Sequence, residues 1–326
     1  MPSSITHAYF SIDLYNKLPK FYQNKVDIKY LKIFSQGSDP FMFYNFLIGK
    51  KAKESMNIQK TIHTKDTNNF FKNTIKHIHN NNLINNKEVM SFLYGFISHY
   101  FLDLYTHPFI YYKTGIFNKK DKSTYKYNCL HQKYEYQIDL YFIKTREKIV
   151  YYKFKPHKFL FSNYKLSTPL LSLINNVMFE TYKYNNLSKK YEKSLKFMYK
   201  TYKYINYDPH SSKLFLYKLI DKFTNDHTTK LNVLSFHNEI NNINQILNLD
   251  NSKWHLPFNK TITSTNSFID LYNLALDDTI NTILKITDML SNNKINDNLI
   301  NNLFQNKSLT TGINCNKKVV MKYFEF

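Results

Sequence analysis

The most constraining feature of the chain is a long apolar run that carries three ionisable side chains at one spacing. Residues 90–112 are rich in Phe, Leu, Ile and Tyr. Within this run His99, Asp103 and His107 follow one another at intervals of four residues. Residues four apart on an α-helix project from the same face, one turn apart. The run therefore predicts a buried helix with a polar stripe of two imidazoles and one carboxylate.

A membrane-spanning helix is the first alternative for such a run. Asp103 at the centre of a bilayer would cost roughly 2.5–3.5 kcal/mol, before the two histidines are added. A buried, unpaired carboxylate in a protein core is also unfavourable, because it loses its hydration. A metal ion is the partner that costs least, since it matches both the carboxylate and the imidazoles. We therefore expect a metal site here and no transmembrane segment.

Composition favours helices over sheets. The 326 residues include only 5 Gly and 8 Pro, and 43% of them are hydrophobic. Folds with Gly-rich phosphate loops or many tight turns need more Gly than this. Helical periodicity recurs at residues 68–80, 130–144, 171–185, 187–205 and 267–290. We predict an all-α fold with one helical domain over residues 1–290 and a C-terminal tail, helical or loose, over residues 291–326.

Net charge and cysteine content indicate which binding partners and which cellular compartment to expect. The formal net charge of +21 suits an anionic partner such as nucleic acid, anionic lipid or a phosphate substrate. The lysines are scattered among abundant Asn, Ile, Tyr and Phe, so we favour compositional drift as the source of this charge. Cys129 and Cys315 have no metal-ligand or redox spacing, and the first 20 residues lack the apolar core of a signal peptide. We expect an unexported, cytoplasmic protein.

Further metal-ligand residue types occur in the first 140 residues. His7 lies in "THAYF", Asp39 in "QGSDPFMFY" and His63 in "IHTKDTNNFF". His131 and Glu135 in "HQKYE" repeat the spacing of four. Zn²⁺ takes nitrogen from His and oxygen from Asp or Glu, so such pairs are natural helical half-sites. One half-site arises often by chance, but two in apolar helices with His and Asp nearby indicate a metal centre.

The order of these motifs resembles that of a known family. The patterns "THxxF", "GxDPxxFY", "IHxxxTxxFF", "GFxxHxxLDxxxHP" and "HxxxExxID" look like the zinc-dependent phospholipase C family over about residues 1–142. That family is all-helical with a trinuclear zinc site, and it shares both with the single-strand-specific P1/S1-type nucleases. Residues 254–275 resemble a C-terminal helical segment of unexported, bacterial-type members.

The resemblance implies up to three Zn²⁺ per chain. It places the first ion between Asp39, His63, His99 and Asp103. Asp103 is implied to bridge to a second ion, which His7 and the N-terminus of the chain also hold. Asp39 is further implied to act as the general base or to orient the attacking water.

The third ion is implied to lie between His107, His131 and Glu135. His107 precedes Pro108, which biases it away from helical dihedrals. We therefore expect the helix to end at His107 and this imidazole to face a different ion from Asp103.

The N-terminus departs from the secreted relatives, which expose a Trp whose amino group binds zinc. Here Met1 is followed by the small residue Pro2, so excision of Met1 is expected. The amine and carbonyl of Pro2 would then lie five residues before His7, the spacing seen in the nuclease branch. We expect Pro2 to complete the second site.

The resemblance implies a phospholipase C reaction. A metal-activated water would attack the phosphate of a phospholipid and give diacylglycerol and a phosphorylated head group. Contact with a membrane surface would then depend on local aromatic residues and Lys. Two alternatives stay open: a P1/S1-like nuclease acting on single-stranded nucleic acid, and a non-catalytic helical protein stabilised by zinc.

Overall fold

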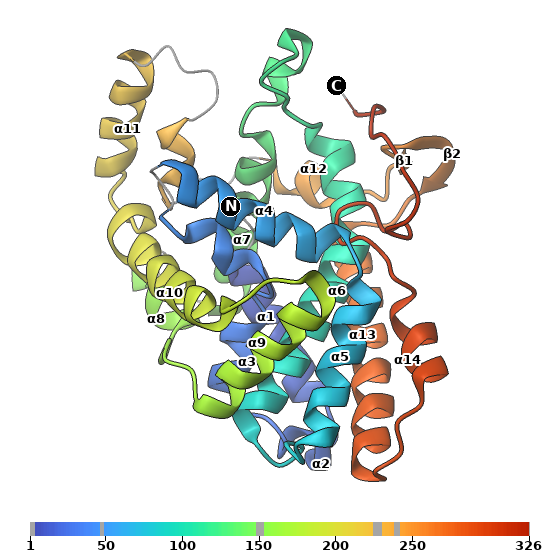
Figure 1. The fold of residues 1–326 in the computed structure, drawn as a ribbon. Helices are drawn as coiled ribbons and strands as arrows, with labels where there is room; N and C mark the ends of the chain where they lie inside the picture. The colour runs from blue at the N-terminus through green and yellow to red at the C-terminus, as the bar shows by residue number, and fades with distance from the viewer. Residues whose placement is uncertain (1–3, 46–48, 148–152, 224–229, 238–241, 326) are drawn as a thin grey trace.

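The fold is a bundle of helices around one long central helix (Figure 1). The computed structural model describes residues 4–45, 49–147, 153–223, 230–237 and 242–325. Among these residues the strands form a single antiparallel hairpin, β1 (Trp254–Leu256) with β2 (Asn259–Ser264). The all-α prediction is confirmed.

The first half of the chain supplies the elements that surround the candidate site. In chain order they are α1 (Ser4–Lys17), α2 (Lys20–Gln23), α3 (Ile28–Phe34), the 3-10 helix η1 (Asp39–Phe43), α4 (Gly49–Thr64), α5 (Thr67–Asn80), α6 (Lys87–Thr114), the 3-10 helix η2 (Lys122–Tyr127) and α7 (Leu130–Glu147).

The second half packs around these elements and completes the core. Its elements are α8 (Pro156–Leu160), α9 (Thr168–Tyr182), α10 (Leu187–Lys200), the π-helical η4 (Thr201–Asn206), α11 (Ser212–Phe223), the 3-10 helix η5 (Leu231–Leu234), α12 (Ile243–Leu247), the β1–β2 hairpin, α13 (Phe268–Ser291) and α14 (Asp297–Phe304). The helices predicted from periodicity are present as α5, α6, α7, α9, α10 and α13.

Helix α6 is the axis of the core, with α13 packed along it (Figure 1). The two helices share a buried hydrogen-bond contact of 2.7 Å between Tyr94 Oη and Thr287 Oγ1. At Gly95 the end of α3 lies so close that an added Cβ would meet the backbone carbon of Phe34 at 2.5 Å. Glycine at this position therefore lets the chain after α3 pass directly beside His99.

We predicted from Pro108 that this helix ends at His107. That prediction is wrong, because α6 continues to Thr114. A proline inside a helix removes one hydrogen bond and costs about 3 kcal/mol. The following turn offsets this cost, because Phe109 and Ile110 are fully buried and Phe109 packs edge-on against Trp254 at 5.2 Å between ring centroids. Tertiary packing here outweighs the local preference of the proline.

The described helices include none that is both long and apolar enough to cross a membrane. The length of α6 is sufficient, but its polar stripe lowers its mean hydropathy. Its burial comes instead from the helices around it, as expected for the centre of a bundle.

The residues after α13 are packed against the bundle. Phe304, at the end of α14, stacks on Phe71 of α5 with 4.0 Å between ring centroids. Residues 306–315, which we call the C-terminal loop, close on themselves through hydrogen bonds from Cys315 N to Asn306 O and from Ser308 N to Ile313 O, each 2.8 Å. This loop contacts the end of α4 through His63 and the second half of α6 through His107.

Candidate metal centre

The fold brings all eight described ligand candidates together around the middle and second half of α6, seven of them buried and His131 partly buried. They come from five elements: His7 on α1, Asp39 on η1, His63 on α4, His99, Asp103 and His107 on α6, and His131 and Glu135 on α7. These residues form three groups, each able to hold a metal ion. Within each group, the nitrogen and oxygen ligand atoms lie within 4.8 Å of one another. The ninth candidate, Pro2, lies outside the described residues.

The first group consists of Asp39, His63 and His99. Nε2 of His63 lies 3.1 Å from Nε2 of His99 and 3.3 Å from Oδ1 of Asp39. Nδ1 of His99 lies 3.2 Å from the carbonyl oxygen of Ser35, which can only accept a hydrogen bond. This contact places the proton on Nδ1, so that Nε2 presents its lone pair to the group.

Gln59 contacts the first group and was not among the sequence candidates. Its Nε2 donates a hydrogen bond of 2.9 Å to Oδ1 of Asp39. Gln59 lies one turn before His63 on α4, so a search for i, i+4 polar pairs that included amides would have found it.

The second group is built around Asp103, whose two oxygens face different imidazoles. Oδ1 lies 3.1 Å from Nε2 of His7, and Oδ2 lies 3.2 Å from Nε2 of His99. This is the arrangement expected of a carboxylate that bridges two sites.

Asp139 fixes the position of His7. This buried carboxylate accepts hydrogen bonds from Thr6 N at 2.8 Å, Thr6 Oγ1 at 2.7 Å and Ile5 N at 3.3 Å. It thus satisfies free N–H groups of the first turn of α1, where a negative charge is also favoured by the helix dipole. Asp139 ends the "HxxxExxID" pattern, and the structure gives this position a physical role.

The third group lies on the other side of Asp103. Oε1 of Glu135 lies 3.1 Å from Nε2 of His131 and 3.6 Å from Nε2 of His107. Nδ1 of His107 donates a 2.8 Å hydrogen bond to the carbonyl oxygen of Leu309 in the C-terminal loop. His107 therefore turns its Nε2 towards Glu135, while its Nδ1 also lies 3.7 Å from Oδ2 of Asp103.

The electrostatics keep the carboxylates ionised. Burial alone would raise the pKa of Asp103, but His107, His99 and His7 hold that pKa well below its usual range. The pKa of Glu135 is lowered in the same way, because His131 and His107 outweigh the effect of burial. Burial lowers the pKa of His99 to about 4, so its imidazole is neutral and able to bind a metal at pH 7.

The donor atoms fit zinc. Ligand atoms at 2.0–2.2 Å from a tetrahedral Zn²⁺ lie roughly 3.3–3.6 Å from one another, close to the 3.1–3.6 Å separations of these nitrogen and oxygen atoms. Among the described residues, Asp103 Oδ2 and Glu135 Oε2 are buried without a hydrogen-bond partner. Buried carboxylate oxygens in this state are unfavourable unless a cation matches them.

A cleft of about 560 Å³ connects the centre to solvent. Asp39, His63, His107 and Glu135 form part of its wall. Its mouth lies between α4 and residues 115–129, where Met56 is 51% exposed and Ile116 is 36% exposed. The cleft is large enough for a small phosphodiester head group and the first atoms of its substituents.

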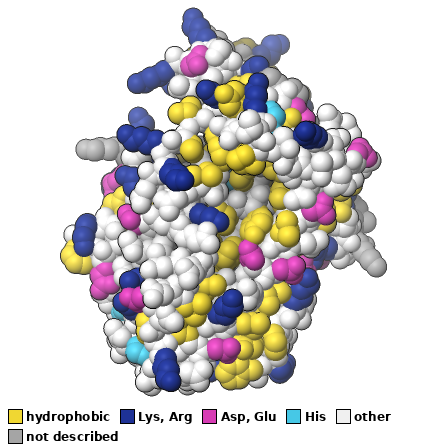
Figure 2. Space-filling view, turned by 90° about the vertical axis from the view of Figure 1, so that its right-hand side faces the viewer, with side chains coloured by type: hydrophobic (Ala, Val, Ile, Leu, Met, Phe, Trp, Pro, Cys, Tyr) yellow, Lys and Arg dark blue, Asp and Glu magenta, His cyan; other side chains and the backbone are white. Residues whose placement is uncertain are grey.

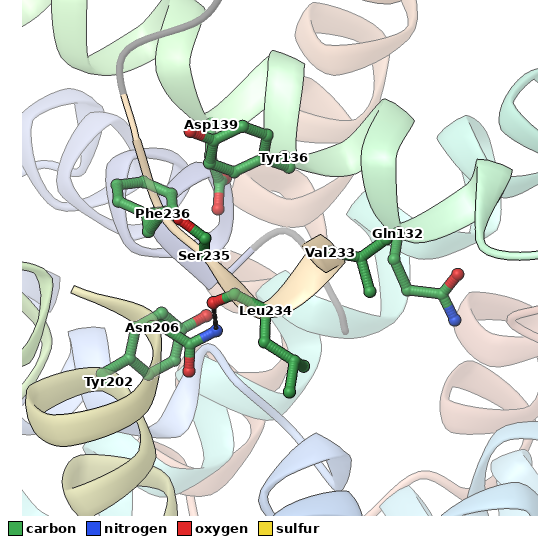
Figure 3. A pocket seen from close by; sticks show the side chains of 9 residues that line it. All are labelled: Gln132, Tyr136, Asp139, Tyr202, Asn206, Val233, Leu234, Ser235 and Phe236. Carbon is green, nitrogen blue, oxygen red and sulfur yellow. Dashed lines mark hydrogen bonds between the residues drawn. The ribbon is translucent and has the colours of Figure 1, made fainter. Parts of the chain in front are cut away.

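A second, smaller cavity of about 30 Å³ lies behind α7, between η4 and η5 (Figure 3). Asn206 Nδ2 donates a 2.7 Å hydrogen bond to Leu234 O across its edge. The space suffices for about two water molecules. Gln132 lines both this cavity and the cleft, so they adjoin through α7.

Comparison with known proteins agrees with this geometry. The family model described as zinc dependent phospholipase C matches residues 6–244, which is more than half of the 326 residues. The chain belongs to the zinc-dependent phospholipase C family. No curated protein and no solved structure matches it. All eight described ligand candidates lie inside the matched region, whereas the β1–β2 hairpin, α13, α14 and the C-terminal loop follow it.

The C-terminal loop thus contacts the centre of this family member from outside the family match. Leu309 N donates a 2.9 Å hydrogen bond to the carbonyl oxygen of His63, and Leu309 O accepts the one from His107. Thr310 lines the cleft. One residue of the tail therefore connects the first group to the third.

Replacement of Gly37 by Ala is expected to disturb the first group selectively. Gly37 has φ +52°, and an added Cβ would lie 2.2 Å from Cδ2 of His99. The left-handed backbone alone costs about 1–3 kcal/mol of unfolding free energy for a non-glycine residue, and the overlap must also displace His99. We expect Gly37→Ala to lower both the denaturation midpoint and the zinc content.

Gly312→Ala is the matched control, because Gly312 has φ +71° but its nearest atom would be 3.4 Å away. It shares the backbone strain without touching a ligand. Chemical denaturation and metal analysis of both variants make the comparison. Full zinc content in Gly37→Ala would contradict the placement of His99.

Proposed function

We propose that this protein is a zinc-dependent phosphodiester hydrolase of phospholipase C type. The observation that carries the proposal is the presence of three groups of zinc-type donors in a member of this family, with residues of the first and third groups in the wall of one cleft. Hydrolysis would give diacylglycerol and a phosphorylated head group.

We assign the ligands as the sequence predicted. Asp39, His63, His99 and Asp103 hold the first ion. Asp103 would also reach the second ion, which His7 and the processed amine of Pro2 would complete. This assignment is supported by the two oxygens of Asp103 facing His99 and His7.

The third ion of the proposal is held by His107, His131 and Glu135. The 2.8 Å hydrogen bond from His107 to Leu309 supports this assignment, because it protonates Nδ1 and leaves Nε2 for the metal.

When bound, zinc would lower the pKa of a water molecule and stabilise the negative charge that develops on the phosphate oxygens. Asp39 is the residue proposed to orient that water and accept its proton. Its pKa is lowered, because His99 and His63 outweigh the effect of burial, so it is ionised at neutral pH. Gln59 holds Oδ1 of Asp39 by its amide, which fixes the carboxylate in the cleft wall.

The rim of the cleft favours lipid over nucleic acid as the substrate. Met56 and Ile116 present exposed aliphatic side chains at its mouth, which suit acyl chains, and the exposed Lys60 suits a phosphate. Stacking of bases needs free aromatic faces. The aromatic rings along the cleft are engaged within the protein, with Tyr111 on His131 at 4.7 Å and Tyr127 against Phe324 at 5.3 Å between centroids.

The direct test is to measure zinc per chain, then phosphocholine release from phosphatidylcholine beside digestion of single-stranded DNA. We expect up to three zinc ions and release of phosphocholine. Digestion of DNA alone would replace the proposal by the nuclease alternative. A three-zinc protein that turns over neither substrate would favour a zinc-stabilised protein without catalysis.

Zinc uptake is expected to release protons at pH 7. Burial alone would lower the pKa of His107, but Asp103 and Glu135 outweigh it and raise that pKa to about 10 in the metal-free protein. His107 is therefore protonated at pH 7 and must lose one proton before Nε2 can bind zinc. The apparent affinity of the third site should rise roughly tenfold per pH unit up to about pH 10.

Calorimetric titration of the metal-free protein in two buffers with different ionisation enthalpies counts the released protons. The variant His107→Gln should release one proton fewer than the wild type. Equal proton release by both proteins would exclude His107 as a ligand.

A further inference from the structure

Helix α11 carries four large apolar side chains on its exposed face. Phe215 is 73% exposed and Phe223 is 77% exposed, and Leu216 and Leu219 between them are also exposed. Phe215, Leu219 and Phe223 are spaced by four residues, so they form one stripe along the helix. None of the residues of α11 is fully buried. A surface helix of a water-soluble protein normally presents the opposite face.

The polar groups of α11 hold it in this orientation. Asp221 accepts hydrogen bonds from Leu231 N at 2.7 Å and Asn232 N at 2.9 Å, both in η5. At the other end, Asp208 accepts bonds from Lys213 N at 3.1 Å and Leu214 N at 2.7 Å. Because carboxylates fasten both ends from the inner side, the apolar face is directed outward by specific contacts.

Cations flank the apolar stripe. Lys218 and Lys222 lie one turn apart and are both exposed, next to Leu219 and Phe223. The acidic residue of α11, Asp221, is turned inward to η5. An apolar stripe beside lysines is the pattern of a helix that lies in the interface of an anionic membrane.

Helix α11 and the rim of the cleft project at the same end of the molecule. In Figure 1 α11 and the segment that contains η2 are both uppermost. Residues 115–129, which include η2, border the cleft, and Lys119, Lys120 and Lys122 within them are exposed. Figure 2 shows Lys and Arg side chains around the topmost projection, with hydrophobic side chains below it.

We propose that the outer face of α11 docks on the surface of a bilayer that contains anionic phospholipid. Phe215, Leu219 and Phe223 enter the boundary between head groups and acyl chains, while Lys218 and Lys222 pair with lipid phosphates. The inference rests on the proposed function in one respect: a bilayer is where a phospholipid substrate lies, and docking by α11 would bring the mouth of the cleft to it.

The test is co-sedimentation of the full-length, zinc-loaded protein with vesicles of phosphatidylcholine and of phosphatidylcholine with phosphatidylglycerol. We expect binding to the anionic vesicles that weakens as salt is raised. The double variant Phe215→Ser/Phe223→Ser should bind them at least tenfold more weakly. Lys218→Glu/Lys222→Glu should lose the preference for anionic vesicles.

Phe21→Ser/Phe179→Ser is the matched control, because these phenylalanines are 50% and 49% exposed on α2 and α9. It removes the same side chains elsewhere and should bind vesicles as the wild type does. Undiminished binding by Phe215→Ser/Phe223→Ser, or absence of binding by the wild type, would overturn the proposal. A change from dimer to monomer in Phe215→Ser/Phe223→Ser, without loss of vesicle binding, would also overturn it. That result would show that the outer face of α11 contacts a second copy of the chain.

Hydrolysis of a short-chain, monomeric phosphatidylcholine separates this proposal from the proposed function. Phe215→Ser/Phe223→Ser should hydrolyse it at the wild-type rate, since α11 contributes no residue to the cleft. Vesicle binding without hydrolysis of any phospholipid by the wild type would leave docking in place and remove the phospholipase assignment. Hydrolysis by the wild type, together with vesicle binding that is unchanged in Phe215→Ser/Phe223→Ser, would keep the phospholipase assignment and remove docking by α11.

Discussion

Replacement of Asp103 by Asn is expected to remove two zinc ions together and to abolish hydrolysis. Its two oxygens face Nε2 of His7 and Nε2 of His99 at 3.1 and 3.2 Å, so one carboxylate is positioned to serve both proposed sites. Asn keeps the shape but has one oxygen and a donor amide, which cannot bind a cation on both sides. The activity should fall at least roughly a thousandfold, because both ions would stabilise the developing charge.

Native mass spectrometry of Asp103→Asn gives the zinc count, and the rate of phosphocholine release gives the activity. Asp121→Asn, in an exposed turn before η2, is the control and should keep both at wild-type values. Loss of one ion only would show that Asp103 does not bridge and that the N-terminal site is absent from this protein.

The candidate ligands could be placed together from the sequence because they are local signals on regular helices. His99, Asp103 and His107 repeat every four residues, and this spacing alone places them on one face of α6. His131 and Glu135 do the same on α7. Periodicity also located the long helices, since an amphipathic pattern persists over many residues.

The parts that sequence reasoning missed depend on contacts between distant segments. Asp139 matters because it caps α1, more than 130 residues earlier, and no local pattern shows this. Pro108 stays helical because Phe109 packs against Trp254 of β1. The expectation of a helical segment over residues 254–275 was wrong for residues 254–264, which form the β1–β2 hairpin. The hairpin itself is short, and short strands carry little periodic signal.

The C-terminal loop is another such contact, and the second large effect is expected on its removal. Leu309 is buried and bonds His63 O through its N–H and His107 Nδ1 through its carbonyl. Truncation after Gln305 should lower the unfolding free energy by roughly 3–5 kcal/mol, from one buried leucine and two hydrogen bonds. The third site should lose roughly 10–100-fold in zinc affinity, because the orientation of His107 is no longer fixed.

Truncation after Asn316 provides the matched control. It keeps the loop closed through the bond from Cys315 N to Asn306 O, but it removes Phe324 and the ion pair of Glu325 with Lys113 at 2.5 Å. Cobalt substitution reports the third site spectroscopically in both truncated proteins, independently of turnover. Equal metal affinity in the two would show that the loop does not position His107. A loss confined to the shorter protein is the expected result, since only that protein lacks Leu309.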